Sequence, residues 1–551
     1  MTTCRTDKSI QIRGLNGCTL TNLIVRGSLS AREVTEHYIR RIEEVNAVLN
    51  AVVVPLFEQA RNQADSLDLA RMRGESLGPL HGVPITVKES VDIAGTPSTL
   101  GLTDRIAHRA SADAFQVSRL RQAGAVILGK TNVSLLLKAY ESDNPVYGRT
   151  NNPWNLDRAP GGSSGGEGAI VAAGGSVLGL GSDFGGSIRL PAHACGVHAI
   201  RPTSGRLTMS GHARVTSAEG AMASQPAPIA RSVADLDLSL RVLAASGQEF
   251  TDSSVAPVPL ATVTGSKRLR VAFYTENGIL RPAPAIRRAV VEAASALAAL
   301  GAEVEEWQPP DLEEAWEIQL RLTCADGLAS YRRALRNSKG QKVRLAAMPS
   351  PVRSAVTLLL QTIGQKKLAA SLRFKHRSSV EQYFELVGRR QEYCIKFLKA
   401  FAARNFDVIL CPPDALPAMK HGSSYYVSGC SVSYPGLYTL LGMPAGVVAA
   451  TRVRSLEETE RSRTSDLVER AARDIEAGST GLPIGVQVAA RHWRENIVLA
   501  TMAMLESFFQ SQPDFPFTPV GCSNACTLAG GAASKRFRPR LNRHFLECRP
   551  E

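Results

Sequence analysis

Long hydrophobic runs are missing from this chain of 551 residues. No stretch of about 18 consecutive apolar residues occurs, although a transmembrane helix needs roughly that length. The N-terminal letters MTTCRTDKSIQIRGLNG also contain no apolar core of the kind that marks a secretory signal peptide. We therefore expect neither a transmembrane helix nor a signal peptide. The expected location is intracellular, with the chain either cytoplasmic or attached to a membrane surface as a peripheral or monotopic protein.

Closely paired cysteines are also lacking. Ten cysteines are present, but none forms a C-x-x-C motif, and the closest two are Cys522 and Cys526. This usage is ordinary for the chain length and favours a reducing, intracellular setting.

Acidic residues are outnumbered by basic ones. The formal net charge is +14 and the isoelectric point is near 9.4, which predicts attraction to anionic surfaces such as membranes or nucleic acid. The basic residues do not concentrate around aromatic residues, and no helix-turn-helix, RRM or zinc-finger pattern occurs. Nucleic acid is therefore not an expected partner.

The most informative stretch is the segment 160–202, in which glycines bracket two serine sites. The letters GGSSGG surround Ser163 and Ser164, and DFGGS ends at Ser187. Apolar residues 177–180 predict a buried strand, and residues 188–194 can open a helix. A serine at such a turn exposes its hydroxyl, and free N–H groups of the glycine turn can point at one oxygen atom, as an acyl-transfer nucleophile requires. Composition alone fits a turn or linker equally well, whereas the Walker and G-x-G-x-x-G patterns of phosphate loops are absent.

Lys88 ends the short stretch VPITVK, whose alternation predicts a strand. Strand geometry places Lys88 on the face opposite Val83, Ile85 and Val87. A lysine can accept a proton from serine only when its amine is neutral, which requires burial or nearby positive charge to lower its pKa from about 10.4. An isolated lysine is usually a solvated surface residue, so its position alone assigns it no role.

Together, the letters GVPITVKES, GGSSGG and DFGGSIRLP resemble the amidase signature family of serine hydrolases. The two serine sites lie 24 positions apart, and GKTN at 129–132 and NPVYGRT at 144–150 fit the same pattern. The resemblance implies a Ser–Ser–Lys triad in which Ser187 is the nucleophile, Ser163 is a bridging serine on a cis peptide bond, and Lys88 is the base. It implies no metal and no organic cofactor.

The resemblance also assigns roles to the residues around the triad. Backbone N–H groups at 184–187 would bind the oxyanion, and the neighbouring polar side chains would support the turn. The implied oxyanion-hole and substrate-binding residues are Phe184, Gly185, Gly186, Ser187, Leu137 and Ser163, and the supporting residues are Ser164, Asp183 and Arg189.

The whole chain predicts one large α/β core. Ser30 and Glu33 form a capping box for a helix over 29–46. A helix over 112–123 lies between the Lys88 strand and an apolar strand at 125–128, an order that favours a parallel sheet. The resemblance implies the amidase-signature fold, with a large mixed, mostly parallel, twisted sheet covered by helices on both faces. The expected organisation is an N-terminal extension over 1–20, a single catalytic domain over 21–510, and a mobile basic tail over 511–551.

Two features narrow the resemblance to the fatty-acid amide hydrolases within that family. Glu167 directly follows GGSSGG, and Leu137 occupies a position that contributes to the substrate site in that branch. By pattern alone, however, Leu135 to Leu137 are most simply core residues.

The segment 348–377 combines an apolar stripe with basic residues. Val352, Val356, Leu359 and Ile363 recur at helical spacing among several arginines and lysines. This pattern suits a helix in a membrane interface, but by pattern alone an amphipathic helix packed on the core is the simpler interpretation. The branch resemblance implies membrane-cap helices at 340–380.

The resulting functional hypothesis is a serine hydrolase that cleaves fatty-acid amides, such as N-acylethanolamines and primary lipid amides, through an acyl-Ser187 intermediate. The expected partners are the lipid amide and a membrane surface contacted through 348–377, and a homodimer is left open. The alternatives are a soluble amidase for short-chain or aryl amides, the A subunit of a tRNA-dependent amidotransferase, and a non-catalytic binding protein on the same scaffold.

Overall fold

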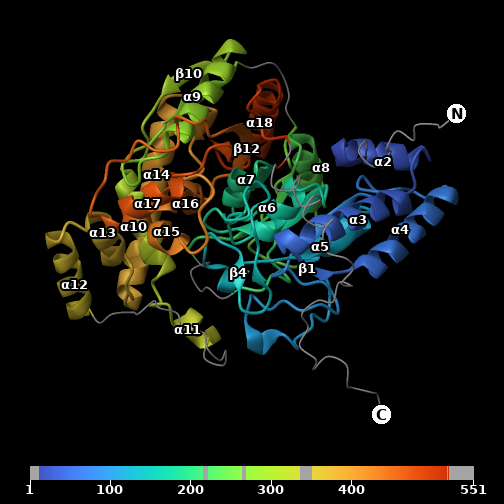
Figure 1. The fold of residues 1–551 in the computed structure, drawn as a ribbon, viewed down its shortest axis with the longest axis horizontal. Coiled ribbons are helices and arrows are strands. Elements are labelled where there is room, and N and C mark those ends of the chain that lie inside the picture. Colours follow the sequence, from blue (N-terminus) through green and yellow to red (C-terminus); the bar gives the residue numbers. More distant parts are fainter. Residues whose placement is uncertain (1–11, 215–220, 263–267, 336–349, 518, 520–551) are drawn as a thin grey trace, which may run out of the picture.

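An extended sheet of 11 strands forms the centre of the computed structural model. The structure describes residues 12–214, 221–262, 268–335, 350–517 and 519. The elements of the first 72 residues lie at one end of the sheet and strand β10 lies at the other (Figure 1). The strands are β1 Val52–Pro55, β2 Pro84–Lys88, β3 Val126–Thr131, β6 Leu178–Asp183, β7 His198–Arg201, β8 Gln225–Ala230, β9 Arg270–Phe273, β10 Glu303–Glu306, β11 Val408–Cys411, β12 Ala445–Arg452 and β13 Pro483–Ala490, and a separate pair is formed by β4 Asp143–Asn144 and β5 Gly148–Arg149.

The sheet is mixed, and its order is β1-β3-β2-β6-β8-β7-β12-β13-β11-β9-β10. The pairs β3–β2, β2–β6, β11–β9 and β9–β10 are parallel, and the other neighbouring pairs are antiparallel. The prediction of a mostly parallel sheet is therefore wrong. The central antiparallel strands of the observed sheet are buried on both faces. They therefore carry the continuous apolar runs that are usually typical of parallel strands.

The predicted strand–helix–strand unit around Lys88 is confirmed. Strand β2 leads through α5 to β3, and the two strands are parallel neighbours. Both strands are fully buried, so this unit carries Lys88 into the interior of the molecule.

Helices cover both faces of the sheet. Gly446 of β12 packs against Met502 of α18, and Gly485 of β13 packs close to His193 of α7. Because Gly446 pairs with Val488, three residues beyond Gly485, the two glycines face opposite sides of the sheet. The helices that bear on the text below are α2 Gly17–Val25, α3 Ala31–Leu49, α4 Phe57–Met72, α5 Phe115–Gln122, α6 Gly165–Ala172, α7 Arg189–Cys195, α8 Val233–Leu243, α9 Pro284–Ala299, α10 Leu312–Thr323, α11 Ala329–Leu335, α12 Ser350–Thr362, α13 Lys366–Phe374, α14 Val380–Ala403, α15 Ser424–Ser431, α16 Ser433–Leu441, α17 Leu467–Glu476 and α18 Glu495–Gln510, together with the short 3-10 turns η1 Thr103–Arg105 and η2 Leu135–Leu137.

The capping box at Ser30 and Glu33 is present at the start of α3, as predicted. The predicted domain limits are less exact. Helix α2 crosses the limit at residue 20, and the N–H of Gly17 donates to buried Asp235. At the other end, Phe515 belongs to the main hydrophobic core, so the predicted tail begins several residues too early. Most of the predicted tail, from residue 520 onward, lies outside the described residues.

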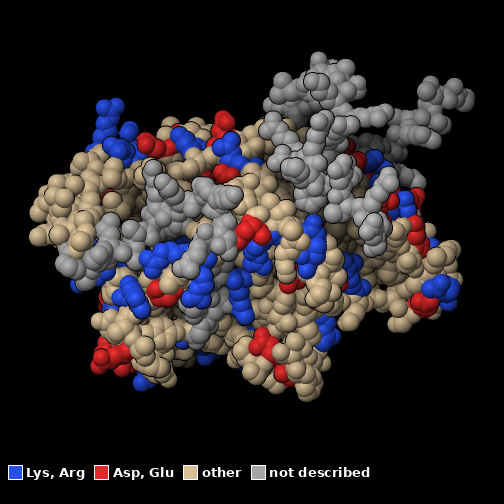
Figure 2. Space-filling model, turned by 90° about the horizontal axis from the view of Figure 1, so that it is seen from below, with Lys and Arg blue, Asp and Glu red and all other residues tan. Residues whose placement is uncertain are grey.

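Charged side chains are interspersed on the face shown in Figure 2, where lysines and arginines lie among aspartates and glutamates. None of the described helices is both long and apolar enough to cross a membrane.

Candidate active site

The predicted serine turn joins β6 to α7 and lies almost wholly inside the protein. Between residues 158 and 202, every residue is buried except Phe184, Ser187 and Gly196. Ser187 follows the end of β6 and precedes the first turn of α7. It is therefore the one residue of the predicted triad that solvent, or a substrate, can reach.

Lys88 and Ser163 are in direct contact beneath this turn. Lys88 lies at the end of β2, and its Nζ is 2.8 Å from the hydroxyl of Ser163. Both side chains are buried, at 0% and 1% exposure. The peptide bond between Gly162 and Ser163 is cis, as the resemblance implies. The structure thus joins two of the three predicted triad members.

Ser187 is linked to the same loop through its backbone. Its carbonyl accepts a hydrogen bond of 3.0 Å from the N–H of Ser164, the neighbour of Ser163. The hydroxyl of Ser164 donates to the carbonyl of Ser182. Among the described residues, the Ser187 hydroxyl has no hydrogen-bond partner. Catalytic hydrogen bonds are often long before substrate binds, so the lack of a partner is compatible with the predicted role of Ser187 as the nucleophile.

Asp183 and Arg189 hold the serine turn in shape. Two nitrogens of the Arg189 guanidinium donate to the Asp183 carboxylate at 2.9 Å, and neither side chain is exposed. Burial alone would raise the pKa of Asp183, but the adjacent guanidinium of Arg189 and further hydrogen bonds lower it to about 2. Asp183 is therefore ionised at every working pH, and its carboxylate can always accept hydrogen bonds from the backbone N–H groups of the turn.

One N–H group of the predicted oxyanion hole, that of Gly186, already has an acceptor. The N–H of Gly186 donates to Asp183 Oδ1 at 2.9 Å, whereas the N–H groups of Gly185 and Ser187 have no acceptor within the described chain. The carbonyl of Gly185 accepts from the hydroxyl of Tyr140 at 2.9 Å. The peptide between Gly185 and Gly186 is thus fixed at both ends. The predicted donor at Gly186 is already occupied, because the turn needs it to bind Asp183.

The electrostatics of Lys88 suit a base. Burial lowers its pKa from 10.5 to about 7, against the opposing charges of Asp183, Glu167 and Glu89. Near neutral pH about half of the Lys88 amines are consequently uncharged. A lysine with an ordinary pKa would be protonated almost completely.

Glu167 lies on the same face of β2 as Lys88. Its carboxylate accepts hydrogen bonds of 2.7 Å from Thr86 and Thr131, and it is fully buried. Burial raises the pKa of Glu167 to about 7, although both hydroxyls and the charge of Lys88 lower it. The lysine is therefore accompanied by a carboxyl group that also titrates near neutrality.

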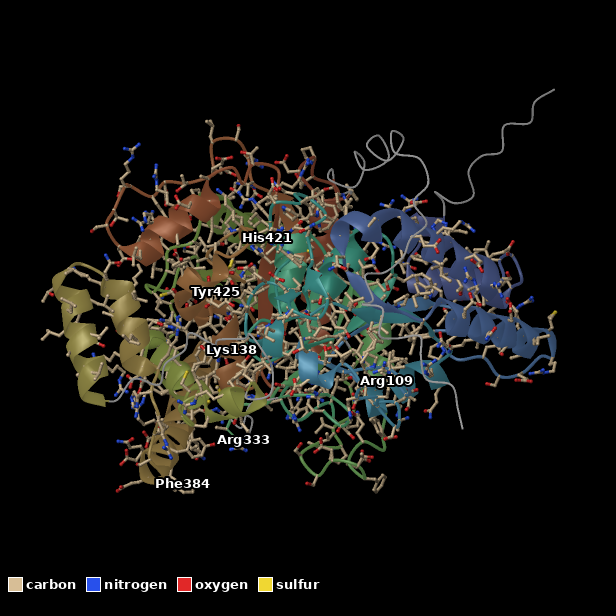
Figure 3. The ribbon with its side chains drawn as sticks, turned by 60° about the horizontal axis from the view of Figure 1, so that its bottom comes forward. Arg109, Lys138, Arg333, Phe384, His421 and Tyr425 are labelled. Atoms are coloured by element: carbon tan, nitrogen blue, oxygen red, sulfur yellow. The ribbon has the colours of Figure 1, made fainter. Side chains whose placement is uncertain are left out.

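Leu137 lies in a small apolar cluster beside the site. The cluster has a buried centre of Leu100, Leu102, Leu136 and Leu335, with half-buried Leu135, Leu137, Ala213, Tyr331 and Ala334 around it. Lys138 lies next to it, with Nζ 4.6 Å from the centre of the Tyr331 ring. Figure 3 shows Lys138 near the middle of the view and Arg333 of α11 below it, toward the lower edge. The half-buried position of Leu137 suits contact with an apolar ligand better than a place in the centre of the core.

Sequence reasoning missed three side chains of this site. Tyr140 binds the serine turn, Ser182 contacts Lys88, and His212 contacts Ser182. None lies in a pattern that predicts a role, although Ser182 stands directly before the letters DFGGS. Within the described residues, no group of three or more His, Cys, Asp and Glu side chains is arranged to hold a metal ion.

Residues 33–499 match the family described as Amidase. The chain belongs to the amidase family. This amidase is 32% identical over 503 residues to "Fatty-acid amide hydrolase 1" of Sus scrofa, an alignment covering 88% of this chain and 84% of that protein. It is 39% identical over 293 residues to "Indoleacetamide hydrolase" of Bradyrhizobium diazoefficiens, covering 53% and 56%.

The fold of this amidase matches a solved structure described as "Fatty acid amide hydrolase". The TM-score is 0.79 at 26% sequence identity, over 91% of this chain and 86% of the other. The amidase-signature fold implied by the sequence motifs is thus confirmed.

Proposed function

We propose that this amidase hydrolyses fatty-acid amides through an acyl-serine intermediate on Ser187. The observation that carries the chemistry is the contact between buried Lys88 and Ser163 beside the turn that carries partly buried Ser187. The relatives described as fatty-acid amide hydrolases, which match most of the chain, support the substrate class.

Acylation moves two protons. As Ser187 Oγ bonds to the amide carbon, its proton passes to Ser163, and the Ser163 proton passes to the neutral amine of Lys88. When the C–N bond breaks, Lys88 returns one proton through Ser163 to the leaving nitrogen. Water then attacks the acyl-serine and gives up its proton along the same route. Cleavage of the ester restores Ser187 and releases the fatty acid.

The developing oxyanion meets the unoccupied N–H groups of Gly185 and Ser187. Each such donor typically lowers the barrier by about 3 kcal/mol. Asp183 and Tyr140 fix the turn from behind, so the donors are in place before the reaction begins.

The helix α12 supports a membrane-facing route for the substrate. Three of its apolar side chains are about half exposed or more, namely Val352 at 49%, Leu358 at 62% and Leu359 at 59%, and so is Ile363, directly after the helix, at 55%. Exposed Lys366 and Arg373 lie on neighbouring α13. An apolar face beside basic residues favours an anionic lipid surface. Direct transfer from the bilayer would avoid exposing the acyl chain to water, at about 0.8 kcal/mol per CH₂.

A soluble amidase for aryl or short-chain amides is the second candidate. The similarity to "Indoleacetamide hydrolase", at 39% identity over about half of the chain, favours it. The two candidates share the same chemistry and differ only in the group that binds beside Leu137.

The deciding experiment compares a long-chain primary amide, acetamide and indoleacetamide, with and without anionic liposomes. We expect kcat/KM to be highest for the long-chain amide and to rise with liposomes. The double variant Leu358→Ser/Leu359→Ser should lose liposome binding. The matched control Leu69→Ser/Leu300→Ser, which changes exposed leucines on α4 and at the end of α9, should keep it. Preference for indoleacetamide, unaffected by liposomes, would establish the second candidate.

A further inference from the structure

Lys88 has a second hydroxyl neighbour besides Ser163. Its Nζ is 3.0 Å from Ser182 Oγ, and Ser182 Oγ is 2.9 Å from Nε2 of His212. A further hydroxyl, that of Ser90, lies 3.2 Å from the same ring nitrogen. The polar contacts of Lys88 therefore extend in two directions, to Ser163 and through Ser182 to His212.

Backbone hydrogen bonds fix His212 in this place. His212 forms an isolated antiparallel bridge with Val91. On either side of it, Ala213 N–H donates to Ser90 and Asp92 N–H donates to Gly211, at 2.7 and 2.8 Å. The backbone of His212 is thus paired with the segment that directly continues β2 beyond Lys88, which places the imidazole close to the end of β2.

Counting hydrogens determines how this group must be arranged for catalysis. A neutral amine has two N–H donors and one lone pair. If the lone pair accepts the Ser163 proton, Ser182 must accept an N–H from Lys88. The Ser182 hydroxyl must then donate elsewhere, and His212 Nε2 is the acceptor within reach.

We propose that His212 is a positioning residue, which accepts the Ser182 hydroxyl proton at Nε2 and so keeps the lone pair of Lys88 directed at Ser163. This inference rests on the proposed function, because it concerns the direction of the same proton relay. Without the acceptor, the Ser182 hydroxyl turns toward Lys88 and competes with Ser163 for its lone pair.

The surroundings of His212 keep its ring neutral. The titratable groups that act on it are Arg214 from its own loop, which is cationic, and Lys88 from β2, which is cationic when protonated. Burial first, and then these two charges, lower the pKa of His212 to about 3. The ring consequently stays neutral throughout the pH range in which Lys88 titrates, and in the tautomer with its proton on Nδ1 it presents Nε2 to Ser182 as an acceptor.

A double-mutant cycle with His212→Leu and Ser182→Ala tests this arrangement. His212→Leu should lower kcat about tenfold with KM unchanged, because a competing hydrogen bond must break before each turnover. In this variant the Ser182 hydroxyl donates to Lys88, which favours the neutral amine and lowers the pKa of Lys88. The acid limb of the pH profile of kcat for His212→Leu should therefore move to lower pH. In the Ser182→Ala background, His212→Leu should have no further effect.

Two more variants provide the controls. Ser90→Ala removes the other hydroxyl at the same ring nitrogen without touching Lys88, and it should keep the wild-type kcat and pH profile. His212→Gln, whose amide oxygen can reach Ser182, should restore most of the activity lost in His212→Leu. If His212→Leu yields no folded protein, His212→Asn replaces it in the cycle, because its side chain is too short to reach Ser182.

Multiplicative losses in the double variant, or an unshifted acid limb in His212→Leu, would overturn the role of His212. Labelling by a fluorophosphonate separates this failure from a failure of the proposed function. Wild-type protein that labels at Ser187 and hydrolyses the long-chain amide keeps the function, even if the cycle is multiplicative. Wild-type protein that neither labels nor hydrolyses it refutes both.

Discussion

Replacing Lys88 by methionine is expected to abolish hydrolysis and yet stabilise the fold near neutral pH. Lys88 is fully buried, and burial lowers its pKa from 10.5 to about 7. At about 1.4 kcal/mol per pH unit, this shift corresponds to a cost of about 5 kcal/mol at pH 7. Methionine has a similar length and no charge, so it avoids that cost.

The lost hydrogen bonds offset part of the gain. Lys88 contacts the hydroxyls of Ser163 and Ser182, and each such bond contributes about 1 kcal/mol. The net stabilisation of Lys88→Met is then about 3 kcal/mol at pH 7.

The pH dependence gives the sharper test. Between about pH 7 and 10 the unfolded wild-type chain keeps a proton on Lys88 that the folded chain has released, so wild-type stability rises with pH across this window. Lys88→Met lacks that rise. The difference in unfolding free energy between Lys88→Met and the wild type should therefore shrink by about 1.4 kcal/mol per pH unit and disappear near about pH 9.

Urea denaturation of both proteins at several pH values between about 7 and 10 measures this difference from midpoints and slopes. Ser163→Ala is the matched control, because it also removes activity but keeps the buried amine. Stability curves that run parallel for wild type and Lys88→Met would refute the depressed pKa of Lys88.

Four further outcomes follow from the site. The value of kcat/KM for a long-chain primary amide should fall about tenfold per pH unit below about pH 7, because the relay needs neutral Lys88; a flat profile from about pH 5 to 9 would contradict this. Asp183→Asn leaves the Arg189 guanidinium buried without its carboxylate, so the unfolding free energy should drop by about 3–5 kcal/mol and hydrolysis should be lost, as thermal melts and an amide assay would show. Gly186→Ala would bring a methyl group within 2.8 Å of Pro435 at a φ of +103, and it should abolish fluorophosphonate labelling of Ser187; normal labelling would mean that the turn tolerates a side chain. Tyr140→Phe removes the hydroxyl that holds the Gly185 carbonyl and should lower kcat about tenfold with little change in KM, whereas an unchanged kcat would show that Asp183 alone fixes the turn.

The sequence predicted those parts of the site that depend on local chemistry. The capping box at Ser30 and Glu33 and the parallel unit around Lys88 follow from short motifs, and the structure contains both. A short motif predicts such features because a capping side chain or an alternating apolar pattern determines the local structure over only a few residues. Such patterns are visible in a single chain. The contact between Lys88 and Ser163, which are 75 positions apart, was implied by the resemblance to the amidase signature family, and the structure contains it too.

Contacts between distant segments were not predictable in the same way. Ser182 is 94 positions from Lys88, and His212 is 30 positions from Ser182. No local pattern requires a histidine at that point, because its role depends on how two loops pair. The direction of strand pairing was missed for a similar reason, since apolar runs record burial but not the direction of a neighbour.

The absence of a side chain at Gly179 has a consequence for the evolution of this pocket. A methyl group there would come within 1.9 Å of a Glu167 carboxylate oxygen, so alanine at 179 would require the Glu167 side chain to move away from Thr86 and Thr131. Replacing Glu167 by a smaller residue first would remove this conflict and ease the change to alanine. An amidase that carries both alanine and glutamate at these positions would need a different position for the carboxylate or a different backbone path for β6.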